Sequence, residues 1–189
     1  MIDGKSILTV ILARSGSKRL PNKNILDLAG KPLIAWSIDS GLKSKYIDKV
    51  IVSSDSDEIL DISKKYGADI IKRPSILAND TASSFDAVKH TIENIKDVLD
   101  YVVLLQPTSP LRNNKHIDEA FELLNKNRAD AIISVTEVDH SPLWSSTLPK
   151  DGSMSNFITK DILGKRSQDL EKYYRLNGAL YICKTKRLL

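Results

Sequence analysis

The sequence lacks the features of a secreted, membrane-spanning or zinc-binding protein. Its 189 residues include a single cysteine, Cys183, so no disulfide can form within the chain, and no Cys/His cluster suggests zinc. The longest apolar run, residues 8–13, is far too short to cross a bilayer. The basic residues Arg14, Lys18 and Arg19 follow this run, whereas a secretory signal carries them in front of it. We therefore expect a cytoplasmic protein that does not bind a membrane.

Aromatic residues are also scarce, at 6% of the chain, and no stripe of Lys and Arg is interleaved with them. Because nucleic-acid surfaces combine basic and aromatic side chains, nucleic-acid binding is the weaker interpretation. The formal net charge of +4 indicates a modest preference for anions, which small polyanions such as nucleotides satisfy equally well. With 41% hydrophobic residues, the chain is expected to form one globular domain over residues 1–189.

Short apolar segments alternate with segments of helical period along residues 7–135. This alternation predicts an α/β fold with a mostly parallel sheet flanked by helices, in which ligands bind beyond the carboxyl ends of the strands. Strands are expected at 7–13, around 51–52, at 70–71, 101–105 and 131–135, and again at 179–182. Helices are expected where apolar residues recur every three or four positions, within 34–42, 59–66, 85–95 and 117–124.

The regular pattern stops after Val135. Residues 138–172 contain prolines and polar turns without periodicity, and long irregular segments of this kind are usually functional or lie between subunits. Residues 185–189 begin a helical pattern that is cut short, so the domain is expected to be truncated at its C-terminal end.

The loop after the first predicted strand, residues 14–24, is rich in small and basic residues. Ser15, Gly16 and Ser17 allow a backbone to pass close to an oxyanion. The loop also carries the cations Arg14, Lys18, Arg19 and Lys23, and it has neither the Walker nor the dinucleotide glycine spacing. We interpret it as a triphosphate-binding loop; a solvated basic turn is the alternative.

Two later loops could also carry chemistry. Residues 72–84 end in several potential helix caps, which either only cap the helix or leave its N-terminal amides for a ligand. Residues 105–112 contain two prolines that fix a turn and aim Gln106 and Arg112, and a plain turn is the alternative. Asp55 and Asp57, after the second strand, are interpreted as a turn and helix N-cap rather than metal ligands.

Several motifs follow one another along the chain: ILAR at 11–14 with SKRLPNKN at 17–24, RP at 73–74, DTASS at 80–84, LQPTSPLR at 105–112 and RLNGALY at 175–181. Together they resemble the acylneuraminate cytidylyltransferases, the CMP-sialic acid synthetase family that also includes enzymes for legionaminic and pseudaminic acids. The similarity runs in order from residue 7 to about residue 183.

The resemblance implies a Rossmann-like nucleotidyltransferase fold that transfers CMP from CTP to an acidic nine-carbon sugar, with Mg²⁺ as cofactor. Arg14 and Lys23 correspond to catalytic residues that grip the CTP phosphates. The implied nucleotide-binding residues are Arg14, Ser17, Lys23, Asn24, Arg73, Ala82 and Ser84. The implied sugar-binding residues are Gln106, Arg166, Arg175, Asn177 and Tyr181.

The resemblance also implies that residues 138–172 form an excursion that exchanges across a homodimer. The family motif RRQDLP appears here as RSQDLE at 166–171, so one arginine and the proline are replaced. The paired aspartates that bind magnesium in the family would lie beyond Leu189, so we expect this 189-residue form to have weak or no activity. Two alternatives remain: a 3-deoxy-manno-octulosonate cytidylyltransferase, although that family has an aspartate where Gln106-Pro107-Thr108 stands, or a non-catalytic nucleotide-binding or dimerising remnant.

Overall fold

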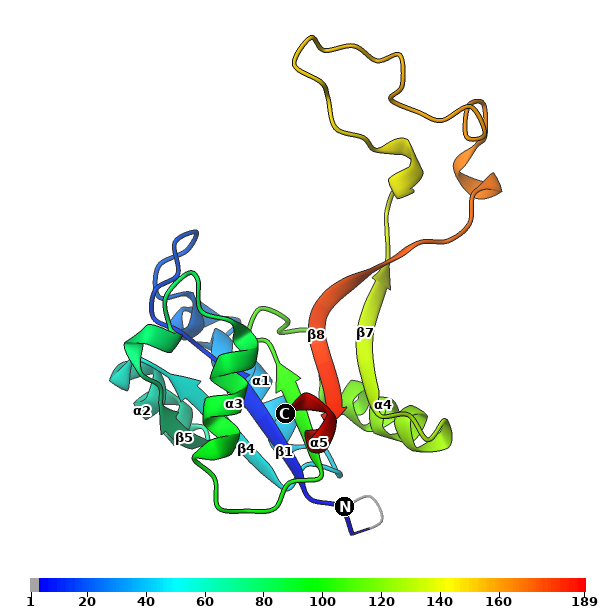
Figure 1. The fold of residues 1–189 in the computed structure, drawn as a ribbon. Coiled ribbons are helices and arrows are strands. Elements are labelled where there is room, and N and C mark those ends of the chain that lie inside the picture. The colour runs from blue at the N-terminus through cyan, green and yellow to red at the C-terminus, as the bar shows by residue number, and fades with distance from the viewer. Residues whose placement is uncertain (1–3) are drawn as a thin grey trace. The chain divides into compact units, whose positions relative to one another are not determined.

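The structure, a computed structural model, describes residues 4–189 and divides them into two compact units (Figure 1). The first unit contains residues 4–133 and 178–189, and the second contains residues 134–177. The second unit includes the predicted excursion at 138–172. Its role in dimerisation stays a prediction.

The main sheet of the described residues has six strands in the order β5-β4-β1-β6-β8-β7. It lies in the first unit, except that residues 134–137 of β7 and 174–177 of β8 belong to the second unit. β5, β4, β1 and β6 run parallel, and β8 runs antiparallel to β6. The prediction of a mostly parallel sheet is confirmed. The strands are β1 (Ile7–Leu12), β4 (Lys49–Ser54), β5 (Asp69–Lys72), β6 (Tyr101–Leu105), β7 (Ala131–Glu137) and β8 (Tyr174–Lys184).

Helices cover both faces of this sheet, and the two faces of β1 show why. Ile7 and Ile11 belong to one buried cluster, and Leu8 and Val10 belong to another, because successive side chains of a strand point to opposite faces. A strand buried on both faces must therefore read as a continuous apolar run. The helices are α1 (Leu33–Leu42), α2 (Asp57–Lys65), α3 (Ser84–Glu93), α4 (Asn114–Lys126) and α5 (Thr185–Leu188).

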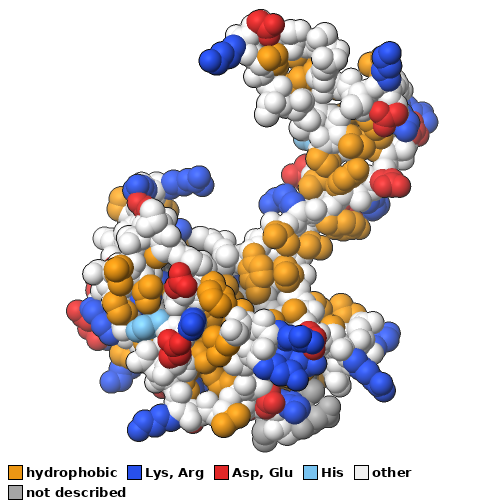
Figure 2. Space-filling view, in the orientation of Figure 1, with side chains coloured by type: hydrophobic (Ala, Val, Ile, Leu, Met, Phe, Trp, Pro, Cys, Tyr) orange, Lys and Arg blue, Asp and Glu red, His pale blue; other side chains and the backbone are white. Residues whose placement is uncertain are grey.

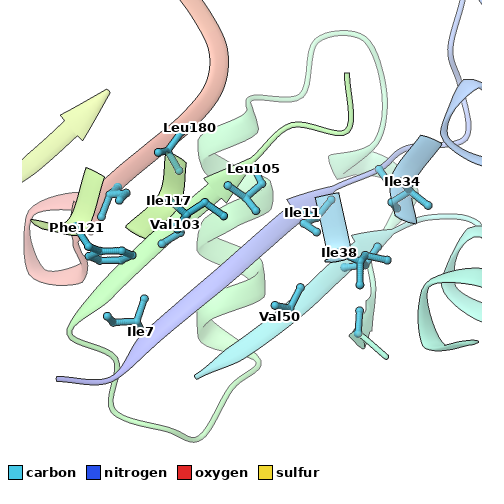
Figure 3. Close-up of a cluster of buried hydrophobic side chains, with 14 of the residues drawn as sticks. Ile7, Ile11, Ile34, Ile38, Val50, Val103, Leu105, Ile117, Phe121 and Leu180 are labelled. Atoms are coloured by element: carbon cyan, nitrogen blue, oxygen red, sulfur yellow. The ribbon is translucent and has the colours of Figure 1, made fainter. Parts of the chain in front are cut away.

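The larger cluster joins one face of the sheet to α1, α2 and α4. Figure 3 shows Ile38 of α1 on the side of Ile11 and Val50, and Ile117 of α4 beside Val103. The smaller cluster joins the other face to α3 through Val88, and α3 is drawn in front of the sheet in Figure 1. Two residues expected on buried faces lie instead near helix ends: Leu42 is 48% exposed and Phe85 is 43% exposed.

Polar side chains cap the starts of α2, α3 and α4. The hydroxyls of Ser56 and Ser83 accept hydrogen bonds from the first turns of α2 and α3, and Asn113 does the same for α4. Ser56 therefore caps α2, and the expectation that Asp55 or Asp57 would do so was wrong. Asp57 is instead the first residue of that helix, where its charge favours the helix dipole.

The second unit has little regular structure. Between its strand residues it holds two short 3-10 turns, Pro142–Trp144 and Ser167–Asp169. At its base, the backbone N–H of Val138 donates to the carbonyl of Tyr173 at 3.0 Å, and Lys172 pairs with Glu137 at 3.1 Å. The irregularity predicted for this segment is confirmed.

No helix within residues 4–189 has both the length and the apolar character needed to cross a membrane. On the face drawn in Figure 2, Lys and Arg side chains are scattered and mixed with Asp and Glu.

Candidate functional site

The loop after β1 is held near its start by Asp55, and its end is tied back to its start by Asn24. The Asp55 carboxylate, which follows β4, accepts hydrogen bonds from the Ser15 backbone nitrogen at 2.9 Å and from the Ser15 hydroxyl at 2.6 Å. At the other end, the buried Asn24 amide donates to the carbonyl of Arg14 at 3.0 Å. Because β1 and β4 are parallel neighbours, their following loops meet at one sheet edge, and this adjacency fixes the backbone of the loop.

The position of Asp55 also determines its charge. Burial opposes ionisation of this carboxyl, but the hydrogen bonds from Ser15, with the positive charge of Arg73, outweigh it and lower the pKa of Asp55. Asp55 is therefore an anion at neutral pH. Sequence reasoning treated this residue as a local turn and missed its contact with Ser15. The signal was its place directly after a strand adjacent to β1.

Arg14 reaches from the first loop to the loop that precedes α3. Its guanidinium lies 2.9 Å from the Asp80 carboxylate and donates to the carbonyl of Asn79 at 2.8 Å. Lys18 also contacts Asp80, at 2.6 Å. The hydrogen bond from Lys18, followed by the interactions with Arg14, lowers the pKa of Asp80. One carboxylate thus pairs with two cations of the predicted triphosphate loop and leaves a net positive charge there.

Arg73 follows β5 and is 5% exposed. Its side-chain Nε and Nη2 are buried, and none of the described residues accepts a hydrogen bond from them. Burial lowers the pKa of Arg73, the charge of Asp55 raises it, and the charge of Arg14 lowers it further. Buried donors without acceptors are rare in proteins and mark positions that serve a ligand or a strained site.

The turn before α3 uses its own side chains to close. The Asn79 side-chain oxygen accepts from the backbone nitrogens of Thr81, at 3.0 Å, and of Ala82, at 2.7 Å. The amide of Ala82 is therefore engaged in this structure. Ser83 caps α3 by accepting from the nitrogen of Phe85, which settles which of the potential caps is used.

The turn after β6 is held from inside the protein. Arg112 is 5% exposed, and its Nη1 donates to the carbonyls of Ala179, at 2.9 Å, and Gln106, at 3.3 Å. Its Nη2 donates to the Ser37 hydroxyl at 2.6 Å. Burial lowers the pKa of Arg112 to about 10, so the side chain remains a cation at neutral pH. Arg112 is thus an internal brace for the turn and does not line the pocket, whereas Gln106 does.

These elements surround one pocket of about 320 Å³ at the carboxyl ends of β1 and β6. Seven of the predicted residues line it: Arg14, Lys23, Asn24, Arg73, Ala82, Ser84 and Gln106. Ser17 lines a neighbouring hollow together with Arg14 and Lys18. A cavity of about 470 Å³ lies at the start of β1 and β6, beside Lys5 and Tyr101, away from the edge where ligands of such sheets bind. The smaller pocket is therefore the candidate site.

The remaining predicted residues do not line this pocket. Tyr181 lies in β8, opposite Leu104 of β6. Arg166, Arg175 and Asn177 belong to the second unit. There, Arg166 pairs with Asp169 at 3.0 Å, and the Asn177 side-chain oxygen accepts from the Ser134 hydroxyl at 2.6 Å. Their contacts with a substrate stay predictions.

The structure is thus a Rossmann-like α/β protein with a pocket lined by Arg14, Lys23 and Arg73 at the carboxyl edge of its sheet. A sequence model of the cytidylyltransferase family matches residues 8–184. The chain belongs to this family.

Curated relatives support the same grouping. The chain is 39% identical, over 93% of its length, to the N-acylneuraminate cytidylyltransferase of Streptococcus agalactiae serotype V, and it spans 42% of that protein's length. It is 37% identical to the pseudaminic acid cytidylyltransferase of Campylobacter jejuni (strain 81-176), over 96% of this chain and 80% of that protein. Among solved structures, a CMP:2-keto-3-deoxy-manno-octonic acid synthetase complexed with CTP has a TM-score of 0.73 at 20% identity, covering 97% of this chain and 76% of that one. At this identity the likeness concerns the fold alone.

Proposed function

We propose that the whole protein transfers CMP from CTP to the anomeric hydroxyl of an acidic nine-carbon sugar, a nonulosonic acid, and releases pyrophosphate. The observation that carries the proposal is the pocket in which the cations Arg14, Lys23 and Arg73 meet the amide of Gln106. The sugar class is supported by relatives named for N-acylneuraminate and for pseudaminic acid.

In the proposed reaction, the sugar's anomeric oxygen attacks the α-phosphorus of CTP in line with the departing pyrophosphate. The new bond joins that oxygen to phosphorus, the bond from the α-phosphorus to the bridging oxygen breaks, and the hydroxyl proton passes to solvent. Such a reaction requires positioning and cations rather than a covalent intermediate. Arg14 and Lys23 line the pocket, and they are proposed to stabilise the charge that builds up on the α-phosphate and pyrophosphate.

The other residues divide between the two substrates. We assign Arg73, with the turn at Ala82 and Ser84, to the cytosine, because the unsatisfied donors of Arg73 suit the acceptor atoms of a base. Ser17 and Asn24 are assigned, with the loop that carries them, to binding of the CTP phosphates. The sugar is assigned to Gln106 and Tyr181 and, from the second unit, to Arg166, Arg175 and Asn177.

Three further parts of the proposal rest on family resemblance. Mg²⁺ is expected as cofactor, but residues 4–189 include no group of three or more His, Cys, Asp or Glu that could hold a metal. Asp55 and Asp80 are already engaged by Ser15 and by Arg14, so the residues present do not fit a magnesium site. A homodimer formed through residues 138–172 and a cytoplasmic location complete the proposal.

Incubation of the whole protein with CTP, Mg²⁺ and a panel of acids tests this function. The panel contains N-acetylneuraminate, pseudaminic acid and the eight-carbon 3-deoxy-manno-octulosonate, and pyrophosphate release is measured. We expect turnover with a nine-carbon acid. Turnover with the eight-carbon acid alone would favour the alternative sugar class, and CTP binding without any turnover would favour a nucleotide-binding remnant.

The role of the pocket is tested by the double variant Arg14→Gln/Lys23→Gln. Removing two cations that contact the triphosphate is expected to weaken CTP binding by about a hundredfold, since each charge-assisted hydrogen bond contributes on the order of a tenfold change. The matched control, Lys126→Gln/Arg187→Gln, makes the same charge change outside the pocket and is expected to leave CTP affinity within twofold of the wild type. Equal effects of the two double variants would reject the site.

A further inference from the structure

The side chain of Gln106 lies against the α-carbon of Gly178. A Cβ atom placed on Gly178 would come within 2.9 Å of the Gln106 Oε1 and 3.2 Å of its Cδ. Gly178 also has φ +73°, a left-handed conformation that side chains rarely adopt. It stands at the point where β8 passes the end of β6, two residues from the Leu105–Leu180 pair. Only a residue without a side chain permits this contact.

The backbone at the same junction is fixed separately. Arg112 donates to the carbonyl of Gln106 and to the carbonyl of Ala179, so one buried side chain ties the turn after β6 to β8. The hydroxyl of Ser37 also donates to the Gln106 carbonyl, at 3.3 Å. With its main chain held by these donors, Gln106 can change the direction of its amide only by rotating its side chain.

We propose that Gly178 is a positioning residue, whose missing side chain lets the Gln106 amide rest against β8 and sets the direction in which it faces the pocket. The inference rests on the proposed function, in which Gln106 binds the acidic sugar. A contact of 2.9 Å is shorter than carbon accepts, so a methyl group at 178 must displace the amide. The Gln106 amide is the free end of a flexible side chain, so the amide moves and the fold persists.

The test compares two alanine substitutions at glycines of positive φ. Gly178→Ala adds backbone strain and the contact with Gln106. Gly30→Ala adds comparable strain, since Gly30 has φ +91°, but its Cβ meets nothing within 4 Å. We expect Gly178→Ala to raise the KM for the sugar about tenfold, with the KM for CTP within twofold of wild type, because a misplaced hydrogen-bonding group discriminates at this level. Gly30→Ala is expected to change neither KM.

A double-mutant cycle shows whether Gly178 acts through Gln106. In a Gln106→Ala background the displaced amide is gone, so Gly178→Ala is expected to add less than a twofold change in the KM for the sugar. Independent, multiplying effects would overturn the inference. So would a Gly178→Ala variant that raises both KM values equally, because that is the result of a purely structural role.

A measurement without turnover separates this inference from the proposed function. The side-chain NH₂ resonances of Gln106, assigned by their loss in Gln106→Ala, are expected to shift in Gly178→Ala and to stay in place in Gly30→Ala. Unmoved resonances in Gly178→Ala would overturn the contact itself. Shifted resonances with an unchanged KM for the sugar would overturn the role in sugar binding. Absence of turnover with every acid would reject the proposed function, and the role of Gly178 in sugar binding with it, while the resonances still report on the contact.

Discussion

Asp55 holds Ser15 through two hydrogen bonds, one from the backbone nitrogen at 2.9 Å and one from the hydroxyl at 2.6 Å. The two residues are 40 positions apart in sequence. They are close in space because Ser15 follows the end of β1, Asp55 follows the end of β4, and these two strands are parallel neighbours. The carboxylate therefore sets the start of the loop that carries Arg14 and Lys23. The Asp55 carboxylate thus influences the shape of the pocket, although Asp55 does not line it.

The first prediction concerns Asp55→Asn. The amide retains one acceptor for Ser15 but loses the charge, so we expect the free energy of unfolding at pH 7 to fall by about 1 kcal/mol. Because the folded pKa of Asp55 is lowered, its stabilisation is fully present above the unfolded pKa of about 3.9 and is lost as pH falls through the folded value. Urea unfolding of both proteins between pH 7 and pH 3 measures this. The difference between them should stay constant down to about pH 4 and shrink below it.

A second prediction follows from the ion pairs of Asp80 with Arg14 and Lys18. A triphosphate that binds Arg14 must compete with this carboxylate, so Asp80→Asn is expected to tighten CTP binding. The pairs are solvent-exposed and therefore weak, so the gain should be about two- to fivefold, and it should disappear at high salt. Isothermal titration at two salt concentrations measures both effects.

The matched control for Asp80 is Asp97→Asn, which removes another exposed carboxylate and its pair with Lys49, outside the pocket. It makes the same change in net charge and should leave CTP affinity unchanged. If Asp80→Asn instead weakens CTP binding, Asp80 contributes directly to the bound state and does not compete with the triphosphate for Arg14.

The regular elements could be predicted because their signals are local. Buried parallel strands must be apolar on both faces, and helices repeat every three to four residues, so β1, β6 and α4 were expected close to where they lie. The partner of a strand is not a local property. Nothing in residues 174–184 indicates that β8 inserts between β6 and β7 and runs antiparallel to β6.

The same division applies to the site. Arg14, Lys23 and Gln106 follow strand ends, and the rule for parallel sheets brings them to one pocket. Asp55 was assigned to its own turn because its Ser15 partner is distant in sequence. Arg112 was expected to be aimed by its prolines, whereas the structure turns it inward to Ser37 and Ala179. Motif residues alone do not tell whether a side chain faces a ligand or the core.

A third prediction concerns the helix that carries Ser37. A Cβ on Gly41 of α1 would approach the Cγ2 of Val50 in β4 to 2.8 Å, too close for two packed carbons. Alanine gains up to about 1 kcal/mol in helix propensity, but overpacking a tight contact costs about 1–3 kcal/mol. We expect Gly41→Ala to lower the free energy of unfolding by about 1 kcal/mol in urea titrations. Gly16→Ala, with no atom within 4 Å of its Cβ and no positive φ, is the control and should have no such cost. Equal stability of the two variants would show that α1 can move away from β4.

The last prediction contrasts two arginines that are equally buried, at 5% exposure, but differently satisfied. Arg112 donates from Nη1 and Nη2 to Ala179, Gln106 and Ser37, and only its Nε is buried without an acceptor among the described residues. Arg73, in contrast, has no such acceptor for either Nε or Nη2. Replacing a buried cation that donates several hydrogen bonds leaves its acceptors without a donor, which lowers stability. Replacing a buried cation whose donors have no acceptor removes the cost of burying that charge, which raises stability. Arg112→Met is therefore expected to lose about 2 kcal/mol of stability and Arg73→Met to gain about 1 kcal/mol without nucleotide.

CTP affinity is expected to rank the two variants in the opposite order from stability, with Arg73→Met the more stable variant and the weaker binder of CTP. Arg73→Met removes donors that line the pocket, so CTP is expected to bind at least about tenfold more weakly to a protein that is otherwise more stable. Thermal unfolding with and without CTP measures both quantities in one experiment, because the stability that a ligand adds grows with the logarithm of its affinity. A stabilised Arg73→Met that keeps its full response to CTP would mean that the unsatisfied donors serve no nucleotide. A destabilised Arg73→Met would mean that the charge of Asp55 needs this cation to fold, since the two attract each other across the base of the loop.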